Sequence, residues 1–153
     1  MADELRVINN DITQYIVVGL GNEQYGIDIK YIDNIVRMQR ITRVPKSAEC
    51  FRGVINLRGE VVPVMSLRVR MGFPEGEITG KSRIIILKVE QSSSIGVLVD
   101  EVKKVYNLSE EDVESVSHDS KSGVQSFISG VGKVDNGLVS LLDLSTIIGG
   151  EVD

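Results

Sequence analysis

The chain has 153 residues, of which 42% are hydrophobic and 25% charged, as expected for one ordinary soluble domain or two very small ones that share a core. The formal charge of −5 argues against a nucleic-acid-binding protein, which usually needs a basic face. A lone cysteine, acidic residues near the N-terminus and apolar runs of only four or five residues indicate a cytoplasmic protein without disulfides, secretory signal or membrane insertion.

The first third of the chain combines short strands with one possible helix. β-branched runs predict a strand at residues 15–18 and an alternating strand at 25–29, separated by a Gly-Asn turn at 21–22. Apolar residues then recur at helical spacing, which predicts one or two helical turns within residues 29–38, with Asp28 as a candidate N-cap.

A β-hairpin is predicted next, with strands at residues 54–57 and 61–65 around an Arg58-Gly59 turn. Pro63 lacks a backbone donor, so we expect it at a sheet edge or a bulge. Residues 73–81 form a polar joint before the next strand.

The second half repeats this order of elements. We expect a strand at residues 84–89, a turn capped by Ser109, a polar loop at 115–122 and a hairpin around 135–137. Asp143 is the candidate N-cap of a short terminal helix at residues 144–148, which Gly149-Gly150 would end.

Internal similarity supports a duplicated unit. Residues 53–72 align with 130–149 at an offset of 77, 26–36 with 96–106 at an offset of 70, and 14–20 with 83–89 at an offset of 69. We therefore interpret residues 1–153 as a single domain whose two copies span roughly 13–72 and 82–149. Each copy is too small to bury a core comfortably alone, which predicts two small barrels or sandwiches that share a hydrophobic seam and leave a groove between them.

No catalytic, metal-binding or cofactor chemistry is indicated. His118 lies in the polar loop, and Cys50 has no histidine or basic pair near it in the sequence. The acidic residues at 109–114 lack the pattern of a calcium loop, and Gly19-Leu20-Gly21 lacks that of a phosphate loop. We therefore expect a binding protein, not an enzyme, with no catalytic residue, metal or cofactor.

The first hairpin carries a specific resemblance. Residues 53–64 read Gly-Val-Ile-Asn-Leu-Arg-Gly-Glu-Val-Val-Pro-Val, which resembles the signature hairpin of the CheW family of bacterial chemotaxis coupling proteins. Similar blocks lie at residues 25–29, 44–45, 98–102 and 142–144, so the resemblance covers residues 14–148.

The resemblance implies a mainly β fold of two pseudo-repeated five-stranded SH3-like barrels that share a hydrophobic core, with short helices. It also implies a function as a non-catalytic adaptor in chemotaxis signal transduction. Such a protein holds the histidine kinase CheA, through its regulatory domain, to the cytoplasmic tips of methyl-accepting chemotaxis receptors. It would be recruited to receptor arrays at the inner face of the membrane.

Two binding surfaces follow from the resemblance. The implied receptor-binding residues are Ile32, Asn34, Ile35, Arg58 and Val105. The implied kinase-binding residues are Val44 and Gly53. The family often has Glu where this chain has Asn34, so an ion pair at that position is not expected.

Alternatives remain open from the sequence. Ile32 and Ile35 fit a core position as well as an interface, Arg58 fits a solvated turn, and Gly53 fits a purely conformational role. The arginines from Arg37 to Arg43 leave a small β-barrel nucleic-acid-binding protein as the alternative function.

Overall fold

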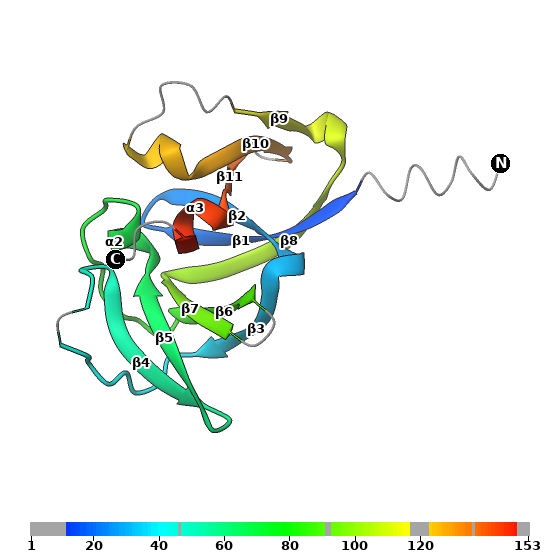
Figure 1. Ribbon diagram of the computed structural model, residues 1–153. Helices are drawn as coiled ribbons and strands as arrows, with labels where there is room; N and C mark the ends of the chain where they lie inside the picture. The colour runs from blue at the N-terminus through cyan, green and yellow to red at the C-terminus, as the bar shows by residue number, and fades with distance from the viewer. Residues whose placement is uncertain (1–11, 46, 91–92, 117–122, 136, 150–153) are drawn as a thin grey trace.

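The computed structural model describes residues 12–45, 47–90, 93–116, 123–135 and 137–149, and these residues form a mainly β structure (Figure 1). The strands are β1 Thr13–Leu20, β2 Glu23–Asp28, β3 Ile32–Arg37, β4 Phe51–Leu57, β5 Glu60–Ser66, β6 Arg83–Glu90, β7 Ser93–Val99, β8 Glu101–Leu108, β9 Val113–Ser115, β10 Ile128–Val134 and β11 Gly137–Leu142. The helical elements are η1 Ile29–Tyr31, α2 Leu67–Arg70, η2 Glu110–Asp112, η3 Gly123–Phe127 and α3 Leu144–Gly149.

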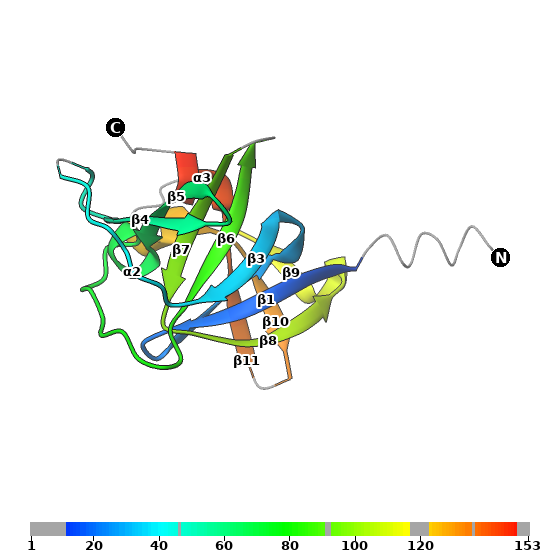
Figure 2. The same cartoon turned by 90° about the horizontal axis from the view of Figure 1, so that it is seen from below.

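The strands form two sheets. The five-stranded sheet has the order β3-β6-β7-β5-β4, and Figure 2 shows its strands side by side. Its strands come from one continuous stretch, residues 32–99. The six-stranded sheet has the order β8-β1-β2-β11-β10-β9 and takes its strands from both ends of the chain.

The two sheets repeat one plan. Strands β8-β1-β2-β11-β10 correspond in order to β3-β6-β7-β5-β4, with a parallel pair at β2–β11 and at β5–β7. Gly26 pairs with Leu141 in the first sheet, and Gly96 pairs with Val64 at the equivalent place in the second. Each sheet therefore combines strands from both sequence copies, so the boundary between the sheets does not follow the boundary between residues 72 and 82.

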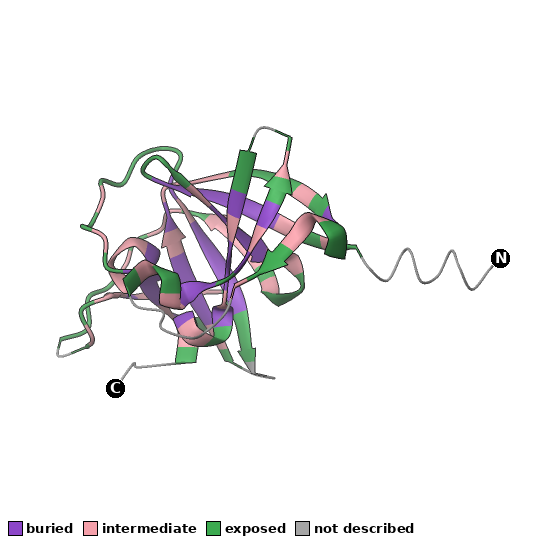
Figure 3. Cartoon of the chain, turned by 90° about the horizontal axis from the view of Figure 1, so that it is seen from above, coloured by how far each residue is buried: buried purple, intermediate pink, exposed green. Residues whose placement is uncertain are grey.

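Three apolar clusters fill the structure, and Figure 3 shows the buried residues of the strands in purple. In β6, Ile85 and Leu87 face the large cluster between the sheets, whereas Ile84 and Ile86 face the small core of the five-stranded sheet. Alternate side chains thus point to opposite faces, and all four are essentially inaccessible to solvent. The expected architecture of two small β barrels that share a hydrophobic core is confirmed.

The segment after β3 completes the five-stranded barrel. Met38 and Ile41 pack on its core, and Thr42 exchanges two backbone hydrogen bonds of 2.8 Å with Val54 on β4. Because β3 and β4 are the two edges of the sheet, this segment connects one edge to the other. The six-stranded sheet has one strand more than expected, the short β9.

Most of the predicted local elements are confirmed. Asp28 caps η1 by accepting a hydrogen bond from the Lys30 N–H at 3.0 Å. Ser109 and Asp112 form a capping box, and the Asp143 carboxylate accepts a hydrogen bond from the Ser145 hydroxyl at the start of α3. The predicted polar loop at residues 115–122 begins at the end of β9, and its residues 117–122, including His118, lie outside the described residues.

The helix predicted within residues 29–38 is wrong beyond Tyr31. Residues Ile32–Arg37 form strand β3, which pairs with β6 and shifts its register between Ile32 and Asn34. That shift places Ile32 and Ile35 against the same core although they lie three positions apart, which imitates helical spacing.

Pro63 lies in an interior strand rather than on a sheet edge. Strand β5 pairs with β4 along its length, but its pairing with β7 begins only at Val64. Pro63 therefore stands where one side of β5 has no ladder partner, so its missing N–H costs no sheet hydrogen bond.

Candidate functional site

A cleft of about 500 Å³ lies where the two barrels meet, beside helix α3. Residues of β1, η1 and the end of β6 form one wall, and residues from β10 to α3 form the other. Its lining residues are Tyr15, Asp28, Tyr31, Lys88, Val89, Ser129, Leu142, Asp143, Leu144, Ser145, Ile148 and Gly149. The groove expected between the lobes is therefore present.

A second hollow of about 570 Å³ adjoins the first, and both are lined by Val89 and Ile148. It occupies the gap between the start of β5 and the start of β7, where the two strands are not yet paired. We call the two hollows together the inter-barrel trough. Its geometry follows from the sheet, because β5 and β7 meet only from Val64 onward.

The trough exposes apolar side chains that the fold leaves uncovered. The exposed fractions are 42% for Tyr31, 67% for Val61 and 39% for Val89. The Lys30 ammonium lies 5.2 Å from the centre of the Tyr31 ring. Removing these surfaces from water would favour binding of another apolar surface.

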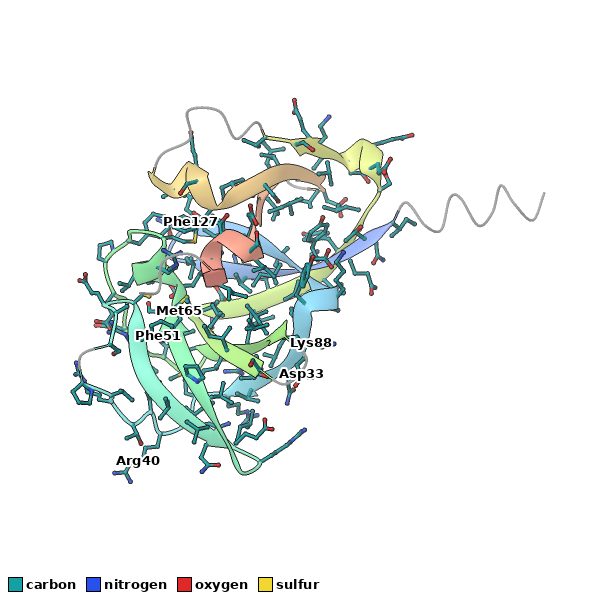
Figure 4. All side chains as sticks on the ribbon, in the orientation of Figure 1. Asp33, Arg40, Phe51, Met65, Lys88 and Phe127 are labelled. Atoms are coloured by element: carbon teal, nitrogen blue, oxygen red, sulfur yellow. The ribbon has the colours of Figure 1, made fainter. Side chains whose placement is uncertain are left out.

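The end of the trough is held by Arg70. Its guanidinium donates hydrogen bonds of 2.8 Å to the carbonyl oxygens of Thr146 and Ile147 and lies 5.0 Å from the ring of Phe127. Figure 4 shows Phe127 beside α3. These contacts fix the last turn of α3, and with it Ile148, against the body of the protein.

Burial and the nearby Asp28 carboxylate raise the pKa of the Tyr15 hydroxyl at the head of the trough. Tyr15 is therefore neutral throughout the physiological pH range and remains able to donate a hydrogen bond.

The predicted receptor-binding residues on β3 are not among the lining residues of the trough. Ile32 follows Tyr31 directly, yet Ile32 and Ile35 are half-buried and pack on the shared core. The side-chain oxygen of Asn34 accepts a hydrogen bond of 2.8 Å from the Ile35 N–H. The core interpretation of the two isoleucines thus accounts for much of their surface, and a smaller part remains accessible.

Arg58 occupies the tip of the β4–β5 hairpin, two residues after Asn56 and three before Val61. It has a φ of +57° and is, among the described residues, the only non-glycine with positive φ. Its side chain is exposed and makes no hydrogen bond or ion pair with a described residue. Such a conformation in a residue other than Gly, Asn or Asp costs of order 1 kcal/mol and often marks a functional position.

Val105 does not join this group. It is 47% exposed on β8, at the free edge of the six-stranded sheet, and pairs with Ile16. It does not line the trough. Ile32 and Arg58 do not line the trough either, but Ile32 directly follows Tyr31 and Arg58 precedes Glu60 by two residues, and both Tyr31 and Glu60 line it.

The two predicted kinase-binding residues differ in kind. Val44 is 44% exposed and lines a hollow of about 490 Å³ formed by the segment before β4. Gly53 is buried with a φ of +141°, and a Cβ there would lie 2.1 Å from the carbonyl oxygen of Thr42. Gly53 therefore serves the close approach of Thr42 to β4 and presents no side chain to a partner.

Cys50 behaves as a packed apolar residue. It is half-buried against the shared core, and burial raises the pKa of its thiol despite the nearby Arg70. A raised pKa leaves little thiolate at neutral pH, which disfavours a nucleophilic role.

The described residues, 12–45, 47–90, 93–116, 123–135 and 137–149, contain neither a metal site nor a membrane-spanning helix. Across these ranges, no group of three or more His, Cys, Asp or Glu side chains is placed to hold a metal ion. No helix in the described part of the chain is long and apolar enough to cross a lipid bilayer.

Tyr31, Val89 and Ile148 were not expected from the sequence as site residues. Tyr31 falls inside the segment predicted as helix, and Val89 reads as one more apolar residue of a buried strand. One feature of the sequence could have identified Val89: the apolar run 84–87 ends at Lys88, which indicates that Val89 lies beyond the buried part of the strand.

Comparison with known proteins identifies relatives over nearly the whole chain. Residues 14–151 match the model of the CheW-like domain. A chemotaxis protein CheW of Bacillus subtilis (strain 168) is 34% identical over 133 residues, covering 87% of this chain and 85% of that protein. One of Thermotoga maritima is 33% identical over 129 residues, covering 84% and 83%.

A solved structure agrees in fold. The crystal structure of the scaffolding protein TtCheW from Thermoanaerobacter tengcongensis aligns with a TM-score of 0.82 at 29% identity, covering 92% of this chain and 97% of that one.

Proposed function

The chain belongs to the CheW-like family, and on that premise we propose that it is a non-catalytic chemotaxis adaptor that couples the histidine kinase CheA to methyl-accepting chemotaxis receptors. The observation that carries the proposal is the family match over residues 14–151, which includes both barrels and the trough between them. An adaptor needs two accessible surfaces and no reacting group, which fits the described residues.

The inter-barrel trough is the proposed receptor surface. A receptor tip would present a helix whose apolar face covers Tyr31, Val61 and Val89. Arg58 stands at the hairpin tip beyond Val61, with its planar guanidinium unpaired and able to bind a carboxylate or carbonyl group. Ile32, Asn34 and Ile35 supply the flank on β3, and Val105 would require a second, smaller contact.

The segment before β4 is the proposed kinase surface. Val44 supplies exposed apolar area there, and Gly53 acts indirectly by letting Thr42 bind β4. Coupling requires that both partners bind at once, on surfaces that meet at Phe51, which lines both the trough and the hollow beside Val44. Receptor state would then act on the kinase through the placement that the adaptor imposes, in the cytoplasm at the inner face of the membrane.

The test uses two equivalent positions of the repeat. Val61 is 67% exposed in the trough, and Leu138, which aligns with it at the offset of 77, is 63% exposed on the β10–β11 hairpin outside the trough. Val61→Asp and Leu138→Asp therefore place the same charge on similarly exposed positions of two similar hairpins.

The protein and both variants are titrated calorimetrically with a receptor-tip fragment and with the regulatory domain of the kinase. We expect Val61→Asp to weaken receptor binding by roughly thirtyfold or more, as loss of a central interface residue does, and Leu138→Asp to leave it unchanged. Both variants should bind the kinase domain normally. Binding of neither partner by the folded wild-type protein would remove the proposed function, and saturable binding of nucleic acid in their place would establish the alternative.

A further inference from the structure

The two barrels carry opposite charge. Residues 32–99, which contain the five-stranded barrel, have eleven Lys and Arg against six Asp and Glu, a formal charge of +5. Residues 12–31 and 100–149, which contain the six-stranded sheet, have five Lys and Arg against eleven Asp and Glu, a formal charge of −6. The overall charge of −5 therefore conceals a strongly polarised molecule.

Four arginines concentrate the positive charge at one end of the five-stranded barrel. Arg37 and Arg83 are direct partners across β3 and β6, and Arg40 and Arg43 follow within the next six residues. Arg37, Arg40 and Arg43 are exposed, and Figure 4 shows Arg40 at the periphery of the molecule. We call these four residues the arginine rim.

No described carboxylate neutralises the arginine rim. The ion pairs between described residues belong to Lys30, Arg52 and Arg68. Arg83 donates from its Nη1 to the carbonyl oxygens of Gly80 and Ser82, which leaves its charge. Like charges directly opposite on neighbouring strands are destabilising, so the Arg37–Arg83 pair opposes folding without compensation from within the described protein.

The rim is also held in place before any partner arrives. Met38 and Ile41 pack on the barrel core between the arginines, and the two hydrogen bonds between Thr42 and Val54 fix the segment on β4. Anchored backbone lowers the entropy lost on binding. Exposed Val44 continues the rim with an apolar surface.

We propose that the arginine rim binds an acidic segment of a protein partner. Guanidinium groups pair bidentately with carboxylates, and several of them in a row match a run of Asp or Glu. Nucleic acid is the less suitable anion. Phe51 lines a hollow together with Arg43, but residues 32–50 add no further aromatic side chain on which successive bases could stack. The negative six-stranded half would also repel a long phosphate backbone. The inference rests on the proposed function and deepens it, because Arg43 lines the same hollow as Val44 on the proposed kinase surface, and it assigns to that side of the barrel the recognition of acidic side chains.

The test compares two triple variants of the full chain that remove the same charge from different barrels. One is Arg37→Gln, Arg40→Gln, Arg43→Gln. The matched control is Lys103→Gln, Lys104→Gln, Lys133→Gln, whose lysines are exposed on the six-stranded sheet. Circular dichroism and urea denaturation verify that both variants fold.

Binding is measured by fluorescence anisotropy with a labelled glutamate-rich peptide, its glutamine counterpart and a single-stranded RNA of matched length, at low and at physiological salt. The glutamate peptide is expected to bind the wild type and the lysine variant and to bind the arginine variant roughly tenfold to hundredfold more weakly, with the difference shrinking as salt rises. The glutamine peptide should not bind.

Three outcomes would overturn the proposal. They are no binding of the glutamate peptide by the wild type at low salt, an equal loss in both triple variants, and tighter binding of RNA than of peptide that depends on the same arginines. Because these probes contain neither receptor nor kinase sequence, a failure here leaves the proposed adaptor function standing, and a failed receptor titration leaves the rim standing.

Discussion

Arg68 and Asp100 join the linker between the sequence copies to the place where the chain crosses from one barrel to the other. The Arg68 guanidinium donates to both carboxylate oxygens of Asp100, at 2.9 Å and 2.5 Å, and also to the carbonyl oxygen of Pro74 at 3.4 Å. Asp100 in turn accepts a hydrogen bond of 2.8 Å from the Gly21 N–H in the β1–β2 turn. The Arg68–Asp100 ion pair thus holds together the segment after α2 at Pro74, the crossing between β7 and β8 at Asp100, and the β1–β2 turn at Gly21.

Asp100→Asn should lower the free energy of unfolding by about 1–2 kcal/mol at pH 7, because it removes a charge-assisted pair that is only partly exposed. The hydrogen bond from Arg68 holds the pKa of Asp100 below its ordinary value. In the unfolded chain an Asp titrates near pH 3.9, so unfolding at lower pH takes up a proton. The stabilisation is therefore complete above about pH 4 and is lost as the pH falls through the lowered pKa of the folded protein.

Urea denaturation of the wild type and Asp100→Asn from pH 7 to pH 2.5 tests this. The difference between the two should shrink below about pH 4. A difference that stays constant over this range would show that the carboxylate charge contributes nothing.

Arg70→Ala should loosen the terminal helix. It removes two hydrogen bonds to α3 and the contact with Phe127, which we expect to lower the free energy of unfolding by about 1–3 kcal/mol. Amide hydrogen exchange in Leu144–Gly149 should accelerate more than exchange in β6. Arg70→Lys is the control, since it keeps the charge but not the planar fork, and it should recover only part of the loss. Unchanged exchange in α3 would contradict the role of Arg70.

Comparing Gly53→Ala with Gly59→Ala distinguishes the destabilisation caused by a steric clash of the new Cβ from that caused by backbone strain. Both glycines have positive φ, but a Cβ at Gly53 meets the Thr42 carbonyl whereas one at Gly59 meets nothing within 4 Å. We expect a loss of about 3 kcal/mol or more at Gly53 and about 1 kcal/mol at Gly59, measured by urea denaturation. An equal decrease in the free energy of unfolding for the two variants would mean that Thr42 can move away from Val54 without destabilising the protein.

Arg58→Asn should stabilise the protein while weakening receptor binding. Asn tolerates positive φ at a hairpin turn better than Arg, so the free energy of unfolding should rise by about 0.5–1 kcal/mol. Binding of a receptor-tip fragment should fall by tenfold or more if the proposed anchor is correct. A stabilised variant that binds the fragment like the wild type would identify Arg58 as a solvated turn residue.

The local elements were largely predictable from the sequence because their signals are local. Asp28 and Asp143 cap short helices as their positions indicate, and the Arg58-Gly59 turn forms the expected hairpin. The helix beyond Tyr31 was mispredicted because a bulge in β3 changes which residues share a face, and a bulge depends on the partner strand β6. The repeat revealed two equivalent units but not that their strands are exchanged, since pairing partners such as Gly96 and Val64 are remote in sequence.

The candidate site was predictable only in part. The duplicated sequence predicted a groove between two lobes, whereas Ile32 and Arg58 were implied by the family resemblance and do not line the trough. It could not give Val61 and Val89, because an apolar residue in a strand looks the same whether the next strand covers it or not. Their exposure arises where β5 and β7 separate, which is a property of the assembled sheet.

The exchange of strands also sets an order of events during synthesis. The hairpin β1–β2 leaves the ribosome first, but β8 and β11, its partners on either side, follow only after the whole five-stranded barrel has been made. A nascent chain that ends near residue 99 contains all five strands of that sheet, whereas Ile16, Val18 and Ile27 of its β1–β2 hairpin still lack the strands that complete their own sheet. The β1–β2 hairpin is thus made before the five-stranded barrel but covered after it, and until β11 emerges its apolar side chains are open to aggregation or to capture by a chaperone.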